Sequence, residues 1–390
     1  MKFFLPFWFA DHVCEPFDPW NDEWKRGQTN WKFIWELKWE RLPFDGLLIS
    51  RPNVERARRW KQLFEEKGIY DAIRLPQHIP TFGDCGAWSY IRDKQPPYNP
   101  EETLDFYRRM KFTCACTVDH IVLPETMKEK YQRLQTTLRN AEIMKKRWDS
   151  DHAYYGFELV GVVQGWDEES YFQSAKQIID MNFGYIALGG QARSPSKVTQ
   201  RILKRCHPLW KGRDIQVHMF GIARWNLFDA YRKFGVTSFD NAYHRRAWIS
   251  ATNNYEIDDK AYTAIRIPLS DRNASKRRKV EQQVFGKLEL FDRRKVGIAS
   301  FLNVLHRYDP SRVEKFHKEY ERTLKDRPWE ECDCPMCRSL GINVCVFRTS
   351  ERNMRRGFHN LWNFYKRLKC VYGTEGSRKE AQLQGLTKWF

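Results

Sequence analysis

Short apolar segments alternate with helical patterns over roughly 200 residues, and this rhythm restricts the possible folds more than any other feature. We predict strands at 46–50, 71–77, 114–124, 156–165, 184–190, 215–221 and 236–242, with helices between them. Strands that are separated by helices favour parallel β-α-β units. The sequence therefore predicts an α/β fold, a TIM-type (β/α)8 barrel, with a doubly wound parallel sheet as the alternative.

The segments outside this rhythm define the remaining predicted parts. Residues 1–44 are rich in Trp and Phe, which suggests an N-terminal cap, and 45–310 are assigned to the barrel. Residues 250–300 break the alternation and predict an insertion, which includes the basic stretch 270–279. Residues 311–390 contain closely spaced cysteines and predict a C-terminal zinc-binding subdomain.

The charge favours an anionic partner. Lys and Arg number 67 and Asp and Glu number 49, which gives a net charge of +18. Such a field suits a polyanion such as nucleic acid, although a basic enzyme of another kind would also show it. The apolar run FFLPFWFA is too short to span a bilayer and lacks a cleavage-site pattern. We therefore expect a cytoplasmic protein with no membrane partner.

Polar residues follow several of the predicted strands. Asp84, Asp119 and Asp240 are carboxylates in such positions, and Gln164 and the pair Gly189–Gly190 occupy others. Each has an ordinary explanation, since Asp often caps a helix and Gly often makes a turn. Together they suggest a site, because two carboxylates can act as nucleophile and acid/base at a glycosidic carbon. A third can accept the N–H donors of a guanine-like edge.

The segment CDCPMC brings Cys332, Cys334 and Cys337 together, which is a typical spacing for zinc ligands. Cys345 and His359 both lie near enough in sequence to supply a fourth ligand. Four protein ligands close the tetrahedral shell and indicate structural rather than catalytic zinc. The alternative is that the cysteines bind no metal.

Five motifs in this order resemble those of the tRNA-guanine transglycosylase superfamily. The resemblance covers roughly residues 45–370 and rests on a small set of segments. These are GDCGAW (83–88) with Asp119 downstream, VVQGW (162–166), ALGGQ (187–191), SFDNAYHRR (238–246), and the cysteine cluster followed by His359.

The resemblance implies a role for each matched residue. Asp240 would be the nucleophile and Asp84 the general acid/base. The base would be bound by Cys85, Asp119, Gln164, Gly190 and Gln191. The zinc ligands would be Cys332, Cys334, Cys337 and His359, with zinc as a structural cofactor.

Two departures from the family pattern argue against a tRNA substrate and leave the exchange chemistry in place. DCGAW replaces a DSGGF-type segment, and HRRAW replaces the PTR-type segment of tRNA-modifying members. The chain is most similar to the DNA-guanine transglycosylase branch, which exchanges guanine in DNA for a 7-deazaguanine such as 7-cyano-7-deazaguanine (preQ0). The alternatives are a tRNA-guanine transglycosylase and a catalytically inactive relative that only binds nucleic acid.

The same resemblance implies three partners: DNA, a free 7-deazaguanine base and an accessory ATPase-type protein. Arginines near the predicted mouth, on the insertion and on the helix of His359 are the expected phosphate contacts. They are Arg245, Arg246, Arg277, Arg278, Arg355 and Arg356.

Overall fold

A computed structural model describes residues 1–373 except 22, 25–29, 123–125 and 271–274. The chain forms two units, and each is described by itself. The first contains Met1–Phe9 and Phe44–Ala242, and the second contains Ala10–Pro43 and Tyr243–Val371. None of the helices in the described residues combines the length and the apolar character that crossing a bilayer requires.

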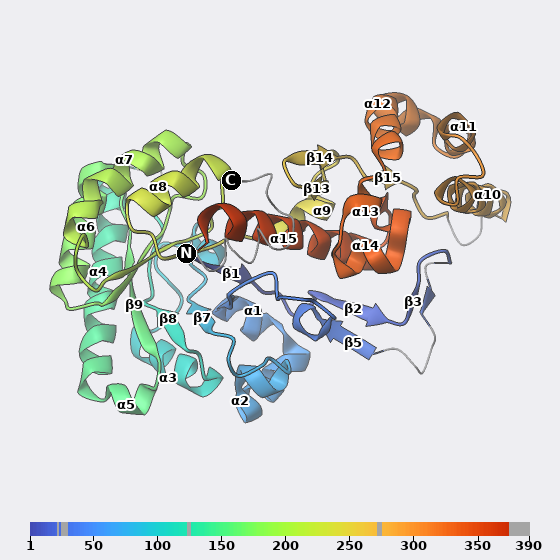
Figure 1. Ribbon diagram of the computed structural model, residues 1–390. Helices are drawn as coiled ribbons and strands as arrows, with labels where there is room; N and C mark the ends of the chain where they lie inside the picture. Colours follow the sequence, from blue (N-terminus) through green and yellow to red (C-terminus); the bar gives the residue numbers. More distant parts are fainter. Residues whose placement is uncertain (22, 25–29, 123–125, 271–274, 374–390) are drawn as a thin grey trace. The chain divides into compact units, whose positions relative to one another are not determined.

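The first unit is built on a closed barrel of eight parallel strands (Figure 1). Closure follows from β1, which pairs with both β12 and β6. This confirms the TIM-type barrel and excludes the doubly wound sheet, whose edges stay open. The strands are β1 (Lys2–Pro6), β6 (Gly46–Ser50), β7 (Thr81–Asp84), β8 (Cys114–Cys116), β9 (Glu158–Val163), β10 (Tyr185–Leu188), β11 (Gln216–Met219) and β12 (Ser238–Asp240).

Helices follow the strands along this unit. Their starts are encoded locally, as in α3, where the Asn99 side chain accepts the backbone N–H groups of Glu101 and Glu102. The helices are α1 (Arg51–Arg56), α2 (Arg58–Ala72), α3 (Pro100–Met110), α4 (Met127–Ser150), α5 (His152–Tyr155), α6 (Glu168–Asp180), α7 (Ser196–Cys206) and α8 (Phe228–Lys233).

Two predictions for this part of the chain are wrong. Residues 1–9 do not belong to a cap, because β1 is a barrel strand. Residues 71–77 are not a strand, because α2 continues to Ala72 and a turn follows it. The second strand is instead β7, which lies between its neighbours β6 and β8.

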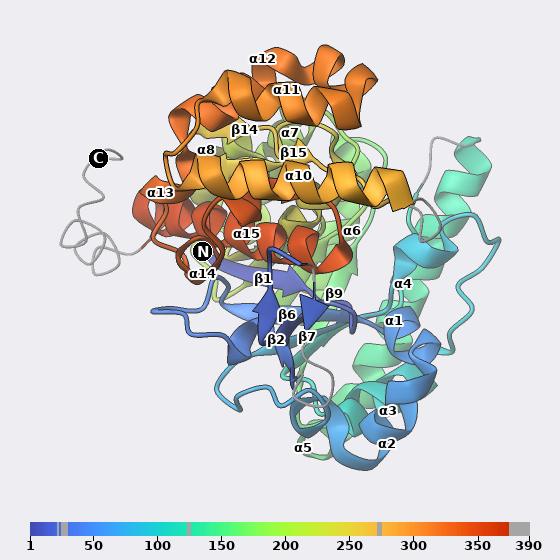
Figure 2. The same ribbon diagram turned by 90° about the vertical axis from the view of Figure 1, so that its right-hand side faces the viewer.

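The second unit combines helices with short two-stranded sheets. Helices α10 (Ser275–Asp292), α11 (Ile298–Tyr308) and α12 (Pro310–Asp326) lie side by side in it (Figure 2). Its other helices are α9 (Arg246–Ile249), α13 (Pro328–Glu331), α14 (Pro335–Leu340) and α15 (Ser350–Tyr372). Its strands are β2 (His12–Glu15), β3 (Phe17–Asp18), β4 (Glu23–Trp24), β5 (Asn30–Phe33), β13 (Tyr255–Ile257), β14 (Lys260–Tyr262), β15 (Ile265–Arg266) and β16 (Val346–Phe347).

The predicted insertion and the predicted C-terminal subdomain are therefore parts of one unit. Residues 10–43 also belong to it, and the barrel unit ends at Ala242 rather than near residue 310. The sequence could not show this grouping, because its parts lie far apart along the chain. The backbone N–H of Cys14, for example, donates to the side chain of Glu351, which is 337 positions away.

Candidate active site

Polar side chains gather at the carboxyl ends of the barrel strands. Asp84 is the last residue of β7 and Asp240 is the last residue of β12. Asp119 follows β8 and Gln164 follows β9. Because all strands of the barrel are parallel, their carboxyl ends meet at one rim, which is where TIM barrels place their chemistry.

The Asp84 carboxylate is held on both oxygens. Its Oδ2 accepts the hydroxyl of Ser50 at 2.5 Å, and its Oδ1 accepts the backbone N–H of Gly86 at 3.0 Å. Burial raises the pKa of Asp84 despite these hydrogen bonds, and the nearby negative charge of Asp240 adds to the rise. The protonated form is therefore favoured more than in water, which suits a proton donor.

The Asp240 carboxylate is buried, and two nitrogen atoms meet on one of its oxygens. Its Oδ1 accepts the backbone N–H of Gly221 at 2.8 Å and lies 3.2 Å from Nε2 of His218. The sequence did not single out His218. The available signal was its position inside the predicted strand 215–221, but the strand period alone does not say which face turns inward.

Asp119 is the centre of a second buried network. Its Oδ1 accepts the Cys85 thiol at 3.0 Å, and its Oδ2 accepts Nε2 of Gln164 at 2.6 Å. The hydroxyl of Tyr90 lies 3.1 Å from the Cys85 sulfur and donates to the Asp119 carbonyl at 3.0 Å. Burial raises the pKa of Asp119 to about 6, although both side-chain hydrogen bonds act to lower it.

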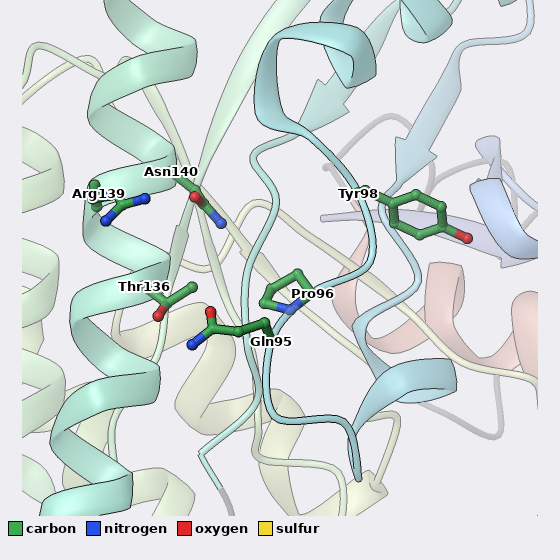
Figure 3. A pocket seen from close by; sticks show the side chains of 6 residues that line it. All are labelled: Gln95, Pro96, Tyr98, Thr136, Arg139 and Asn140. Carbon is green, nitrogen blue, oxygen red and sulfur yellow. The ribbon is translucent and has the colours of Figure 1, made fainter.

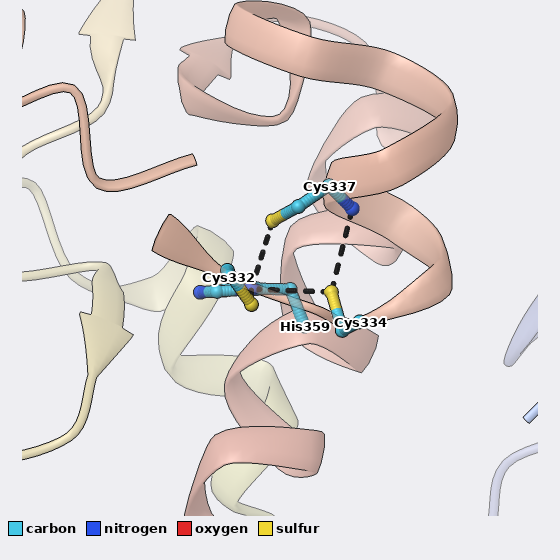
Figure 4. A group of neighbouring side chains, drawn as sticks. All are labelled: Cys332, Cys334, Cys337 and His359. Carbon is cyan, nitrogen blue, oxygen red and sulfur yellow. Dashed lines mark hydrogen bonds between the residues drawn. The ribbon is translucent and has the colours of Figure 1, made fainter. Parts of the chain in front are cut away.

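Three cysteines and one histidine meet in the second unit (Figure 4). Nδ1 of His359 lies 3.4 Å from the sulfur of Cys332, 3.4 Å from that of Cys334 and 3.2 Å from that of Cys337. All four residues are buried, and their ligand atoms all lie within 4.8 Å of one another. Cys345 is not a member of this group, so the geometry selects His359 as the fourth ligand.

These separations fit a metal ion. Tetrahedral zinc with Zn–S near 2.3 Å and Zn–N near 2.0 Å would separate sulfur and nitrogen by roughly 3.5 Å. The surroundings fit as well: the Tyr255 ring stacks on the His359 ring with centroids 3.9 Å apart, and its hydroxyl lies 3.3 Å from the Cys337 sulfur. The four residues can hold a metal with no position left for substrate.

Comparison with known proteins agrees with this geometry. A family model described as queuine tRNA-ribosyltransferase matches residues 86–344. A curated protein of Salmonella montevideo, named DNA-guanine transglycosylase, is 34% identical over 379 residues, which covers 86% of this chain and 89% of that protein. The chain belongs to the queuine tRNA-ribosyltransferase family. It is thus a transglycosylase, an enzyme of the pentosyltransferase class, and the resemblance found in the sequence is confirmed.

A close approach explains the glycine pair of this transglycosylase. A Cβ on Gly189 would lie 2.3 Å from Nε2 of Gln164, and one on Gly190 would lie 2.7 Å from Oε1. Gly190 also has a φ of +75°, which favours glycine. The pair therefore leaves room for the Gln164 amide beside Asp119.

Gln191, which was predicted to line the base pocket, has its side chain in a buried hydrogen-bond network. Its side chain is buried, with Nε2 donating to the Tyr171 hydroxyl at 2.9 Å and Oε1 accepting from Thr199 at 3.2 Å. The Tyr171 hydroxyl in turn donates to the Gly189 carbonyl at 2.7 Å. Both ends of the amide are used in this network, so Gln191 supports the glycine turn.

An exposed tryptophan follows the proposed acid closely in the sequence. Trp88 follows Asp84 by four positions and is 49% exposed, and the Arg193 guanidinium lies 4.8 Å from its ring centroid. Neither residue could be singled out from the sequence. A half-exposed indole beside a cation offers a flat surface for a base.

The structure does not support Arg355 and Arg356 as phosphate contacts. Both are buried in the second unit. Arg355 binds Glu15 at 2.9 Å and the Cys14 carbonyl at 2.7 Å, while Arg356 donates to the Ala247 carbonyl at 2.7 Å. Their guanidinium groups stabilise the packing of α15, and the helix does not present them to solvent.

The other predicted arginines are more accessible. Arg246 is 46% exposed and pairs with Glu256 at 2.9 Å, and Arg245 is half-buried beside the Trp248 ring. Arg278 is exposed on α10. The side chain of Arg277 lies outside the described residues.

A polar pocket of about 400 Å³ lies between the loop after β7 and helix α4 (Figure 3). None of the predicted site residues lines it. The lining residues are Gln95, Pro96, Tyr98, Thr136, Arg139 and Asn140. It is separate from the hydrogen-bond networks of Asp84, Asp119 and Asp240.

Proposed function

We propose that this transglycosylase exchanges guanine in DNA for a 7-deazaguanine base, with 7-cyano-7-deazaguanine as the incoming base. The observation that carries the proposal is the pair of strand-end carboxylates in unlike environments: Asp240 accepts the Gly221 N–H and contacts Nε2 of His218, whereas burial favours the protonated form of Asp84. The relative that is named DNA-guanine transglycosylase supports DNA as the nucleic acid and guanine as the base that is exchanged. The net charge of +18 is consistent with a DNA partner.

The proposed reaction proceeds by double displacement. The target guanine leaves the stack, and the Asp240 carboxylate attacks C1′ as the bond from C1′ to N9 breaks. Asp84 gives its proton to the departing base. It then takes the proton of the incoming base, whose nitrogen attacks C1′ and expels Asp240. Two inversions retain the configuration at C1′.

Asp119 and Gln164 are the proposed base-reading groups. An ionised Asp119 can accept the N1–H and N2–H donors of guanine, and the Gly190 N–H can serve its carbonyl oxygen. Cys85 is fully buried and bonded to Asp119, so we assign it the task of orienting that carboxylate. The proposed metal is a structural zinc held by Cys332, Cys334, Cys337 and His359.

The proposed surface contacts are less specific. Arg245, Arg246 and Arg278 stay candidates for binding phosphates, and Trp88 with Arg193 joins them as a surface for a base. The accessory ATPase-type partner and the role of Arg277 stay predictions.

The choice of substrate is tested by supplying isotope-labelled 7-cyano-7-deazaguanine with duplex DNA or with tRNA. We expect the label in deoxynucleosides after digestion and mass spectrometry, and none in the tRNA digest. Asp240→Asn serves as the matched control for background label. Label in tRNA alone would establish the tRNA alternative, and label in neither would support the inactive relative.

The pKa of Asp119 predicts an acid limit to the exchange. The group has to be ionised to accept the base, so kcat/KM should fall about tenfold per pH unit below its pKa of about 6. Unfolding would not explain this loss, because a carboxyl whose pKa is raised on folding stabilises the folded state when it is protonated. Initial rates from pH 4.5 to 8, together with thermal unfolding at each pH, measure the two effects separately.

An acid limb that persists unchanged in Asp119→Asn would assign the titration to another group. A flat profile down to pH 5 in the unmodified enzyme would contradict the requirement for an ionised Asp119.

A further inference from the structure

His218 is a fully buried histidine whose ring nitrogens both contact polar side chains. Nε2 lies 3.2 Å from Oδ1 of Asp240, and Nδ1 lies 2.9 Å from the Ser238 hydroxyl. The Ser238 oxygen also lies 2.7 Å from the Tyr185 hydroxyl. A chain of hydrogen bonds therefore runs across three neighbouring strands, β10, β11 and β12, and ends on the carboxylate that we propose as the nucleophile.

The barrel fixes this arrangement. His218 and Ser238 are partners in the ladder between β11 and β12, so their side chains share a face. The imidazole packs among aromatic rings, with the centroids of Phe82 and Phe220 both 4.8 Å away and that of Phe4 5.9 Å away. Two hydrogen bonds and three rings hold the imidazole in one orientation.

The direction of the chain follows from its far end. The Tyr185 hydroxyl has no hydrogen-bond partner other than Ser238 among the residues that the structure describes. If Tyr185 donates to Ser238 and Ser238 donates to Nδ1, every group in the chain is satisfied and Nε2 carries the proton. The opposite direction would leave the Tyr185 proton with no acceptor. The neutral Nε2–H tautomer therefore donates to Asp240.

Both donors reach the same oxygen of the carboxylate. Oδ1 accepts from His218 and from the Gly221 N–H at 2.8 Å, while Oδ2 accepts no hydrogen bond from the described residues. We propose that His218 is a positioning residue that, with Gly221, holds Oδ1 and leaves Oδ2 free to attack C1′. This inference rests on the proposed function, since it takes Asp240 as the nucleophile.

The chemistry needs no proton transfer through the ring. Oδ2 supplies the electron pair for the new bond to C1′, and Oδ1 becomes the carbonyl oxygen of the ester. In the second displacement the C1′–Oδ2 bond breaks and its electron pair returns to the carboxylate. Fixed N–H donors on Oδ1 stabilise that returning charge. His218 should therefore affect the formation and the breakdown of the covalent intermediate, and have little effect on binding of the free base.

Two amide variants separate the two contacts of the ring. In His218→Gln the amide nitrogen reaches about as far as Nε2 and can still donate to Asp240. In His218→Asn the amide reaches only as far as Nδ1, so the contact with Ser238 survives and the one with Asp240 is lost. We expect Asn to lower kcat by roughly 10- to 100-fold with KM for the base nearly constant, and Gln to restore the rate to within roughly fivefold.

The measurements are steady-state exchange and single-turnover formation of the covalent DNA adduct, with thermal unfolding to confirm that each variant folds. Should His218→Asn fail to fold, Ser238→Ala removes the donor to Nδ1 and should slow adduct formation by roughly three- to tenfold. Equal rates for Asn and the unmodified enzyme, or equal losses for Asn and Gln, would overturn the assignment. If the unmodified enzyme forms no adduct with DNA or tRNA, the proposed function fails and this inference fails with it.

Discussion

Asp240→Asn should abolish base exchange and leave no covalent adduct between protein and DNA. The amide keeps the size of the side chain and an oxygen that can accept from Gly221 and His218, so the site should stay in place. An amide is a far weaker nucleophile than a carboxylate, and loss of a nucleophile typically costs at least roughly 10³-fold in rate. Denaturing gel electrophoresis of the reaction quenched with acid, together with exchange of labelled guanine, measures both effects.

Two further variants make this result specific. Asp84→Asn removes the proposed acid, so it should slow departure of guanine while an adduct still forms over longer times. Asp214→Asn removes one negative charge from an exposed position of the same unit and should exchange at the normal rate. An adduct that survives in Asp240→Asn would assign the nucleophile to another residue.

The positions of the proposed catalytic carboxylates could be predicted because their signals are local. Each lies at or just after a short apolar strand, and parallel strands separated by helices place their carboxyl ends at one rim. The structure confirms that Asp84 and Asp240 lie at strand ends, even though the sequence misplaced the second strand at 71–77. This error does not change the predicted position of Asp84, because the first two residues of the motif GDCGAW are the last two residues of β7.

The residues that support these carboxylates could not be predicted in this way. Whether His218 faces inward depends on the pairing of β11 with β12, which is a property of the closed barrel. The same holds for β1, whose two partners are the strands at the opposite ends of the alternating region. Non-local pairing leaves little trace in the periodicity of a single segment.

The arginines of α15 show the opposite error, in which a local signal was misleading. The positive charge of this helix suggested that Arg355 and Arg356 contact phosphates. Arg355 is buried, however, and its partners include Glu15 and the Cys14 carbonyl from the N-terminal segment of the same unit. A charge can be buried when it is paired and bonded, and only the tertiary structure shows that pairing.

Removal of the proposed structural zinc should unfold the region around α14 and α15. The four proposed ligands are buried: Cys332, Cys334 just before α14, Cys337 within α14 and His359 on α15. Structural zinc contributes about 10–16 kcal/mol in zinc-finger peptides, so even a fraction of this would be large for one unit. We expect Cys337→Ser, or a strong chelator, to lower the unfolding temperature of that unit by roughly 10 °C or more.

Metal content distinguishes this effect from ordinary loss of packing. Native mass spectrometry should find one metal ion in the unmodified protein and none in Cys337→Ser. Cys345→Ala is the matched control, because Cys345 is equally buried yet lies outside the four ligands, so it should keep the metal and lose only a small amount of stability. Because the ligand shell is closed, activity should fall with the folded fraction and not with a separate chemical step. If the metal-free protein unfolds at the normal temperature, or if Cys345→Ala loses the metal, the four-ligand structural site is wrong.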